Sequence, residues 1–193
     1  MAAKVKNPIS GKEEEVYALV DTGANRDYMS TELAERLGLE IRYSTMNLKT
    51  ATEASIGVRP MTDMILESRD GQYKARVDDV LIGDFPCKDS SMAPGKKDWS
   101  NYEHLKGIEF ADIEAEVELI ISSAHTEATI WSEVSKPKRG GKDGENDGDT
   151  DTPGKRGKGK RSKEPVATRN AFGWTLQGPD GTKGGSQASI SLL

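Results

Sequence analysis

An apolar run that ends in an acidic residue and a glycine turn constrains this chain more than any other stretch. Val16–Val20 is uncharged and rich in valine, leucine and tyrosine, which is typical of a buried β-strand. Asp21-Thr22-Gly23 follows directly, so the strand delivers the Asp21 carboxylate to its end. Burial at such a point raises the pKa of a carboxylate unless hydrogen-bond donors compensate. The stretch therefore favours acid–base chemistry at Asp21.

A plain turn is the competing interpretation, because Asp-x-Gly is also an ordinary turn signal. The residues around the triplet argue against it. Small Ala24 comes next, and the spacing of apolar residues predicts a helix over 29–39, which Ser30 or Thr31 caps at its start and Gly38 ends. The order of strand, triplet and short helix favours a catalytic aspartate over a structural turn.

Composition limits the class of protein. Hydrophobic residues make up 34% of the 193 residues and charged residues 31%, so part of the chain lies outside any packed core. The single cysteine, Cys87, excludes an internal disulfide framework and fits a reducing compartment. Apolar runs stay well short of the roughly 20 residues of a membrane helix, and the N-terminus lacks the apolar part of a signal peptide. We therefore expect an intracellular, cytoplasmic protein without membrane contact.

Short strands separated by turn signals predict an all-β fold. Asp70-Gly71 indicates a tight hairpin turn, and Pro60 restricts its own strand to an edge position or to its first residues. The N-terminal segment, residues 1–7, is short, polar and basic, and we expect it to fray. Thr50–Gly57 is expected to form a loop or hairpin tip. The predicted strands cover residues 41–50, 58–67, 73–82 and 117–121.

Three segments are predicted along the chain. Residues 1–134 have the composition of a globular domain. Residues 135–165 hold many glycines, clustered acids and then clustered bases, and almost no apolar side chain, which is typical of a disordered linker or insertion. Its basic half is the one place where nucleic acid contact is conceivable, although a solvated run is favoured. Residues 166–193 form a C-terminal extension with a short strand-like segment.

Several blocks in order resemble a known family. They include Ala18–Gly23, the helix end Leu37-Gly38-Leu39, His104–Asp112 and Phe172–Gly178. Together they resemble the retropepsin-like aspartic peptidase segment of Pao/BEL-type LTR retrotransposon polyproteins. The resemblance covers most of residues 14–134 together with 166–178. It implies a closed β fold with one short helix after the active-site loop, and aspartic endopeptidase activity on a polyprotein, in the cytoplasm or in a retrotransposon particle.

The resemblance also implies roles for individual residues. Asp21 is the catalytic aspartate, Thr22 bonds across to its counterpart in a second chain, and Gly23 lets the substrate backbone approach. Ala24 and Asn25 line the cleft, while Thr50–Gly57 forms a flap that contributes further substrate contacts. These flap residues are Ala51, Thr52 and Glu53.

The second structural strand of the family matches Ile120, Ile121 and Ser122, and here the chain departs from the family pattern. Ser122 stands where glycine is usual, and Ala124 stands where aspartate is common. If the family's glycine adopts a positive φ, a serine there is strained by about 1 to 3 kcal/mol. An adapted loop and a degenerate, weakly active copy are both consistent with this departure.

Aspartic protease chemistry needs two carboxylates that share one proton, and the chain has one convincing Asp-Thr-Gly. A symmetric homodimer brings two copies of Asp21 together. The leading hypothesis is therefore a homodimeric aspartic endopeptidase without a metal or cofactor. A catalytically silent peptide-binding module with the same fold is the alternative, and a nucleic-acid-binding tail carried by the globular part is the third.

Other candidate chemistry is weak. His104 and His125 are far apart in sequence and have no cysteine pair, so a zinc site is disfavoured. Cys87 has no histidine near it in sequence and is interpreted as a bystander. The glycine pairs at 140–141 and 184–185 follow no predicted strand and indicate no phosphate loop. The tryptophans at 99, 131 and 174 are interpreted as packing or interface residues.

Overall fold

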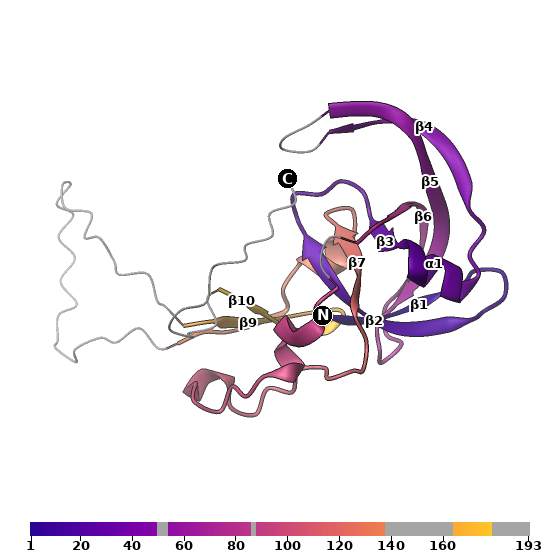
Figure 1. Ribbon diagram of the computed structural model, residues 1–193. Helices are drawn as coiled ribbons and strands as arrows, with labels where there is room; N and C mark the ends of the chain where they lie inside the picture. Colours follow the sequence, from indigo (N-terminus) through magenta and orange to yellow (C-terminus); the bar gives the residue numbers. More distant parts are fainter. Residues whose placement is uncertain (50–53, 86–87, 138–163, 179–193) are drawn as a thin grey trace, which may run out of the picture.

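Six β-strands close into a barrel in the computed structural model, which describes residues 1–49, 54–85, 88–137 and 164–178 (Figure 1). Each strand pairs with the next in the order given below, and β1 also pairs with β5, which closes the ring. The ring consists of β1 (Ala2–Lys6), β2 (Glu13–Asp21), β7 (Val117–Ser122), β3 (Tyr28–Ser30), β6 (Lys74–Gly83) and β5 (Ala54–Glu67).

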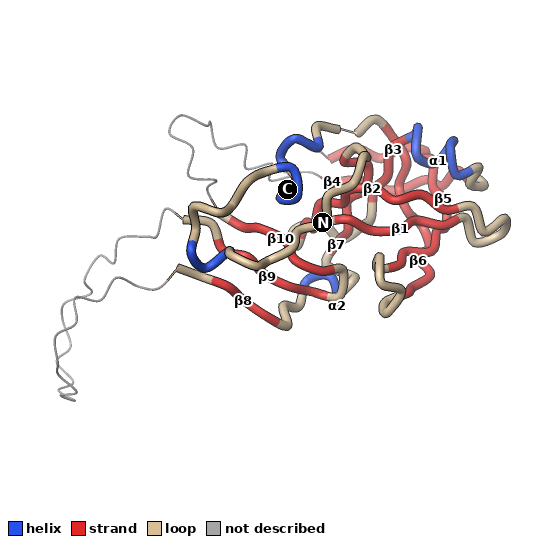
Figure 2. Tube along the Cα trace, turned by 90° about the horizontal axis from the view of Figure 1, so that it is seen from below, coloured by secondary structure: helices blue, strands red, loops and turns tan. Residues whose placement is uncertain are grey.

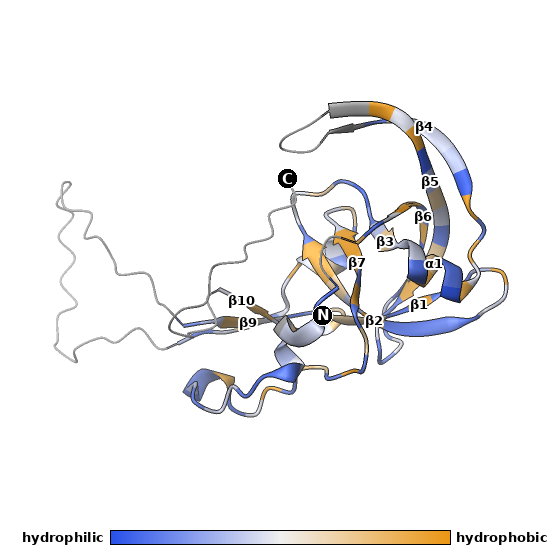
Figure 3. Ribbon diagram, in the orientation of Figure 1, coloured by the Kyte–Doolittle hydropathy of each residue, from blue (hydrophilic) through white to orange (hydrophobic). Residues whose placement is uncertain are grey.

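The barrel core is built from the apolar stretches that the sequence marks most strongly. All six residues of β7 are buried, and the strand lies between β2, with which it runs parallel, and β3, with which it runs antiparallel. In Figure 3 the apolar colour is prominent along β2 and β7. Two sequence segments about 100 residues apart thus share one buried layer at the centre of the barrel.

The N-terminal segment is a strand of the barrel, which corrects the expectation that residues 1–7 fray. Ala2, Ala3 and Val5 are buried in β1. The basic side chains that suggested a solvated lead-in have acidic partners, since Lys6 pairs with Glu13 on β2 at 2.7 Å. Opposite charges on adjacent strands stabilise the pairing, so the basic and acidic runs support a strand pair rather than oppose one.

The short helix after the Asp-Thr-Gly turn forms as its capping residues predict, although it is shorter than 29–39. Helix α1 (Thr31–Leu37) begins after Ser30, whose Oγ accepts a hydrogen bond from the Leu33 N–H at 3.0 Å. Gly38 ends the helix with φ 63°, in the left-handed region. Tyr28–Ser30 belongs to β3 instead, because this segment pairs with β6 and β7.

We expect Gly38→Ala to lower the free energy of unfolding by about 1 kcal/mol, because an L side chain is strained at the positive φ of Gly38. Equilibrium unfolding in urea measures the change. Gly57→Ala is the matched control, since Gly57 has no positive φ and an added Cβ there meets no atom within 4 Å. Equal stability losses in the two variants would contradict the conformational explanation.

A long hairpin formed by β4 (Arg42–Lys49) and the first half of β5 extends beyond the barrel and curves over the side where β2 ends (Figure 1). Pro60 lies inside β5, not at its start. Pairing of β5 with β6 begins only at Met61, so at Pro60 the strand pairs with β4 alone. The proline is tolerated for the reason expected of an edge position.

The predicted hairpin through Asp70-Gly71 is present between β5 and β6. Gly71 has φ 73°, and its N–H donates to the Ser68 carbonyl at 3.0 Å. The Asp70 carboxylate accepts from the Gln72 N–H at 3.1 Å, which closes the turn locally.

A second, three-stranded sheet lies beside the barrel (Figure 2). It contains β8 (Glu133–Ser135), β9 (Val166–Asn170) and β10 (Gly173–Gln177), with β9 in the centre. The short helix α2 (Thr126–Thr129) connects β7 to this sheet, and three short 3-10 helices precede β7: η1 (Ser90–Met92), η2 (Pro94–Lys96) and η3 (Glu103–Leu105). Buried Trp99, Leu105 and Ala167 join the loop segment to the sheet.

The long insertion connects two strands that are neighbours. β8 and β9 pair antiparallel, with Ser135 opposite Ala167, so residues 138–163 occupy a hairpin connection between them. We expect replacement of 138–163 by a four-residue Gly/Ser turn to raise the free energy of unfolding by only about 1 kcal/mol, because loop closure depends weakly on length. Urea unfolding tests this, and a loss of several kcal/mol would contradict it.

The architecture confirms the expected all-β, closed-barrel fold of the retropepsin-like type, with one short helix after the active-site loop. The predicted disordered linker falls largely on residues 138–163, which lie outside the described residues. The division into segments 1–134, 135–165 and 166–193 stays a prediction. In the described residues, no helix is long and apolar enough to cross a membrane.

Candidate active site

Asp21 is the last residue of β2, and the buried strand β7 fixes its position. The two strands are parallel, with Val20 opposite Ile121 and Asp21 opposite Ser122. Because parallel strands end at the same edge of a sheet, the residues that follow β2 and those that follow β7 meet there. The predicted catalytic segment and the predicted second structural strand are thus brought together.

One oxygen of the Asp21 carboxylate accepts a hydrogen bond from a described residue, and the other oxygen accepts none. Oδ1 accepts the Gly23 N–H at 2.8 Å, and the Asp21 carbonyl accepts the Ala24 N–H at 3.2 Å, so the triplet forms a tight turn. Oδ2 is buried and accepts no hydrogen bond from any described residue. A buried carboxylate oxygen without a donor is costly, and such groups cluster at sites that act on a further molecule.

The loop after the triplet is fastened to the turn that follows β7. Ser123 donates twice to the Ala24 carbonyl, from its N–H at 3.1 Å and from its hydroxyl at 2.9 Å. Thr22, Gly23 and Asn25 are exposed beside this anchor, and Ala24 is half-buried. The anchor fixes the loop backbone while it leaves these predicted contact residues accessible.

A buried aspartate at the end of the loop makes the second fastening. Asp27 accepts the Ser122 N–H on Oδ1 at 2.8 Å, and its Oδ2 lies 3.0 Å from His125 Nε2. Burial would raise the pKa of Asp27, but the hydrogen bonds from His125 and Ser122 hold it below its usual range. The hydrogen bond to Asp27 raises the pKa of His125, against the opposing effect of burial. The pair is therefore an ion pair in mildly acidic solution.

Ser122 occupies its place without backbone strain. It is fully buried in β7, and Asp79 is the one non-glycine residue with positive φ in the described part of the chain. Its N–H bonds Asp27, and its Oγ accepts from the Ala124 N–H at 3.4 Å. The strain considered from the sequence for a serine at this position is thus absent, and the serine backbone is part of the anchor.

Tyr28, the first residue of β3, comes directly after the loop that follows Asp21. Its hydroxyl donates to the Asp84 carbonyl at 2.9 Å, and its ring centroid lies 6.0 Å from that of Phe85. Burial raises the pKa of the Tyr28 hydroxyl, as does the Asp84 charge, while the nearby Arg59 charge on β5 opposes the rise. Arg59, on the β4–β5 hairpin, therefore contributes positive charge near the Tyr28 hydroxyl.

The predicted flap contacts Ala51, Thr52 and Glu53 lie outside the described residues, as does Cys87. The described arms of the hairpin carry large exposed apolar side chains on one face, since paired positions of antiparallel strands point the same way. These side chains are Tyr43, Ile56 and Val58.

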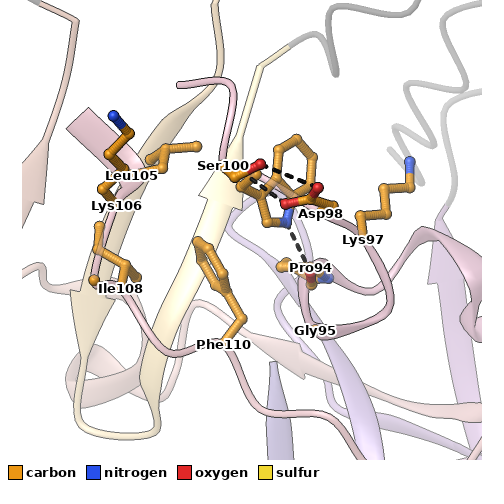
Figure 4. Close-up of a pocket in the computed structure, with 11 residues that line it drawn as sticks. Pro94, Gly95, Lys97, Asp98, Ser100, Leu105, Lys106, Ile108 and Phe110 are labelled. Carbon is orange, nitrogen blue, oxygen red and sulfur yellow. Dashed lines mark hydrogen bonds between the residues drawn. The ribbon is translucent and has the colours of Figure 1, made fainter. Parts of the chain in front are cut away.

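A pocket of about 320 Å³ lies elsewhere, in the loop segment before β7 (Figure 4). Trp99 and Phe110 line it, and the indole N–H of Trp99 donates to the Pro94 carbonyl at 2.8 Å. The adjoining residues Ala111 and Ile113 bond the Tyr17 hydroxyl, at the other end of the apolar stretch from Asp21. The pocket shares no lining residue with the Asp21 loop.

The contact between Asp27 and His125 was not predicted from the sequence, in which His125 was considered only as a zinc ligand or as a solvated or packing residue. The two histidines have separate surroundings, because His104 Nε2 lies 2.8 Å from the Pro165 carbonyl, while His125 contacts Asp27. One local signal exists, an acid closely following the Asp-Thr-Gly triplet. This signal does not identify the partner of Asp27, since His125 lies 98 positions away in the sequence.

Comparison with known proteins gives one match. Residues 5–90 match the sequence model of a family described as Aspartyl protease. The matched segment runs from β1 through β6 and contains Asp21-Thr22-Gly23, but it ends before β7. No curated protein and no solved structure matches the chain. The match supports an aspartyl protease family for this chain.

Proposed function

We propose, from the aspartyl protease match over residues 5–90, that the chain is an aspartic endopeptidase with Asp21 as its catalytic carboxylate. The observation that carries the proposal is the buried, unpartnered Oδ2 of Asp21 at the end of β2. The loop around this carboxylate is fastened by Ser123 and Asp27, so the scaffold holds the oxygen in place rather than satisfying it. Pre-organisation of this kind is what acid–base catalysis requires.

The chemistry requires two carboxylates that share one proton. The ionised carboxylate takes a proton from a water molecule, which attacks the scissile carbonyl carbon, while the protonated carboxylate donates a hydrogen bond to the carbonyl oxygen. The tetrahedral intermediate then breaks at the C–N bond, and the carboxyl group that took the proton from water gives it to the leaving nitrogen. Because the two carboxylates are coupled, their apparent pKa values belong to the pair.

We further propose that a second copy of the chain supplies the second carboxylate. Asp21 belongs to the one Asp-Thr-Gly triplet of the sequence, and the exposed Thr22 and Gly23 leave its loop accessible to a partner. An isologous contact about a two-fold axis brings the same surface of each copy together, so two Asp21 side chains meet at the axis. The substrate would then lie across both copies, beneath the two hairpins.

The substrate class follows from the resemblance of several sequence blocks to Pao/BEL-type retrotransposon peptidases. We propose that the enzyme processes a retrotransposon polyprotein in the cytoplasm or in a particle. Exposed apolar side chains on the β4–β5 hairpin, Tyr43, Ile56 and Val58, are consistent with a protein that contacts extended polypeptides.

Concentration-dependent proteolysis tests the proposed function. A mixed peptide library is incubated with the chain at mildly acidic pH, with and without pepstatin, while sedimentation measures the dimer fraction at each concentration. We expect inhibitor-sensitive cleavage whose specific activity falls in parallel with the dimer fraction on dilution. Absence of cleavage where the chain is dimeric would overturn the enzyme proposal and leave the silent peptide-binding module as the better account.

A further inference from the structure

We propose that the Asp27–His125 ion pair is a pH-dependent clamp that positions the Asp21 loop, most firmly in mildly acidic solution. His125 and Asp27 are positioning residues in this proposal, since neither reaches the reacting atoms. The inference about activity rests on the proposed function, whereas the inference about the clamp itself does not.

The clamp joins three segments at one point. Asp27 belongs to the segment after the Asp-Thr-Gly turn, Ser122 ends β7, and His125 immediately precedes α2. Asp27 is 7% exposed and uses both carboxylate oxygens, one for the Ser122 N–H and one for His125 Nε2. Its carbonyl also accepts the Leu81 N–H of β6 at 3.0 Å. A buried carboxylate in such a network is strongly held only while its charged partner is present.

The clamp acts on the catalytic loop through short, direct links. Ser122 is the strand partner of Asp21, and the adjacent Ser123 holds the Ala24 carbonyl by two hydrogen bonds. The loop from Asp21 to Asp27 is thus fixed at its start, middle and end by the turn that follows β7. Release of His125 removes the charged contact at the end of the loop and weakens the support of the whole turn.

Three groups facing the imidazole determine its charge. The Asp27 carboxylate lies against Nε2, the Tyr73 hydroxyl from the β5–β6 connection lies 3.5 Å from Nδ1, and the Glu127 carboxylate of α2 acts through its charge. Burial raises the pKa of Tyr73, as do the charges of Glu127 and Asp27, so the tyrosine stays neutral across this range. Among the described residues, two acids and no base thus face His125, which favours the imidazolium.

The pH range of the clamp follows from the directions in which the pKa values of Asp27 and His125 are shifted. The Asp27 pKa lies below its ordinary value of 3.8, so the carboxylate is already ionised in mildly acidic solution. The His125 pKa lies above its ordinary value of 6.5, so the stabilising contribution is complete below 6.5 and is lost as pH rises through the raised value. The clamp is therefore strongest across mildly acidic pH and weakens on the alkaline side, where the imidazole loses its charge.

Titration of His125 by NMR tests the clamp without any reference to activity. The chain has two histidines, so His104→Gln leaves a single imidazole to follow. We expect the pKa of His125 to lie above 6.5, and Asp27→Asn to bring it down to 6.5 or below, because the asparagine keeps an acceptor but removes the charge. An ordinary pKa that Asp27→Asn does not change would overturn the clamp.

A pH profile of peptide cleavage tests the consequence for the loop. We expect His125→Gln to lower kcat/KM about tenfold at pH 5 while it changes activity at pH 8 by less than about twofold, which flattens the alkaline limb. His104→Gln is the matched control and should keep the wild-type profile. An unchanged limb in His125→Gln would overturn the coupling to activity. If the chain cleaves nothing, the proposed function fails, and the NMR titration still decides the clamp.

Discussion

Asp21→Asn should abolish peptide cleavage, with kcat/KM reduced by at least about 10³-fold, because an amide neither takes a proton from water nor shares one with a second carboxylate. Cleavage of a fluorogenic peptide at mildly acidic pH measures the loss. Asp70→Asn is the matched control. Asp70 also precedes a glycine and accepts turn hydrogen bonds, but it lies in the β5–β6 connection rather than at the end of β2.

The same substitution should leave stability unchanged or higher. The Gly23 N–H has an acceptor in the asparagine as it has in Asp21 Oδ1, while the uncompensated Oδ2 no longer carries charge. Unfolding in urea measures this second effect. A variant that loses activity and folds at least as stably assigns the loss to chemistry. Retention of more than about a tenth of the wild-type activity would show that Asp21 is not the catalytic residue.

Mixing experiments connect this variant to the proposed dimer. If both copies of Asp21 act together, a mixed dimer with one Asp21→Asn chain is inactive. When wild-type and variant chains associate at random, activity then falls with the square of the wild-type fraction. A linear fall would indicate that each chain acts alone, and would contradict the shared carboxylate pair.

Local features of the fold were predictable because their causes lie within a few residues. Ser30 and Gly38 mark the ends of α1, and Asp70-Gly71 marks the hairpin, since caps and turns depend on neighbouring backbone groups. Asp21 was predicted as the catalytic residue on the same kind of local signal, because the apolar run before it and the glycine after it are adjacent in sequence.

Features that depend on distant partners were not predictable in this way. Residues 1–7 look like a solvated lead-in until Glu13 on β2 is seen to pair with Lys6. The insertion of β7 between β2 and β3 brings Ser122 to the Asp21 loop, and no periodicity reports such an arrangement. His125 was discounted because its partner, Asp27, is a single acid far away in the sequence.

A buried ion pair behind the active-site loop should carry the largest share of stability of any single charge pair in the described barrel. Glu118 of β7 is 3% exposed. Its Oε2 accepts from Arg36 Nη2 at 2.6 Å, and its Oε1 accepts from Arg36 Nη1 at 3.1 Å and from the Ser30 hydroxyl at 2.8 Å. The carboxylate therefore holds both ends of α1 onto the strand that carries Ser122.

We expect Glu118→Ala to lower the free energy of unfolding by about 3 kcal/mol, at the low end of the range for broken buried pairs, because the Arg36 side chain is 43% exposed and recovers water. Glu118→Gln keeps the hydrogen-bonding shape and should cost about half as much. The matched control is Glu133→Gln, which breaks an exposed pair with Arg169 and should cost less than about 1 kcal/mol.

The pH dependence of these losses separates charge from packing. Burial would raise the pKa of Glu118, but the hydrogen bonds from Arg36 and Ser30 lower it below its ordinary value of 4.5. Its stabilising contribution is therefore present above pH 4.5 and is lost as pH falls through the lowered value. Urea unfolding at pH 7 and at pH 3 should show the difference between wild type and Glu118→Gln shrinking in acid. A difference that is constant with pH would mean that packing, and not the ion pair, holds α1 against β7.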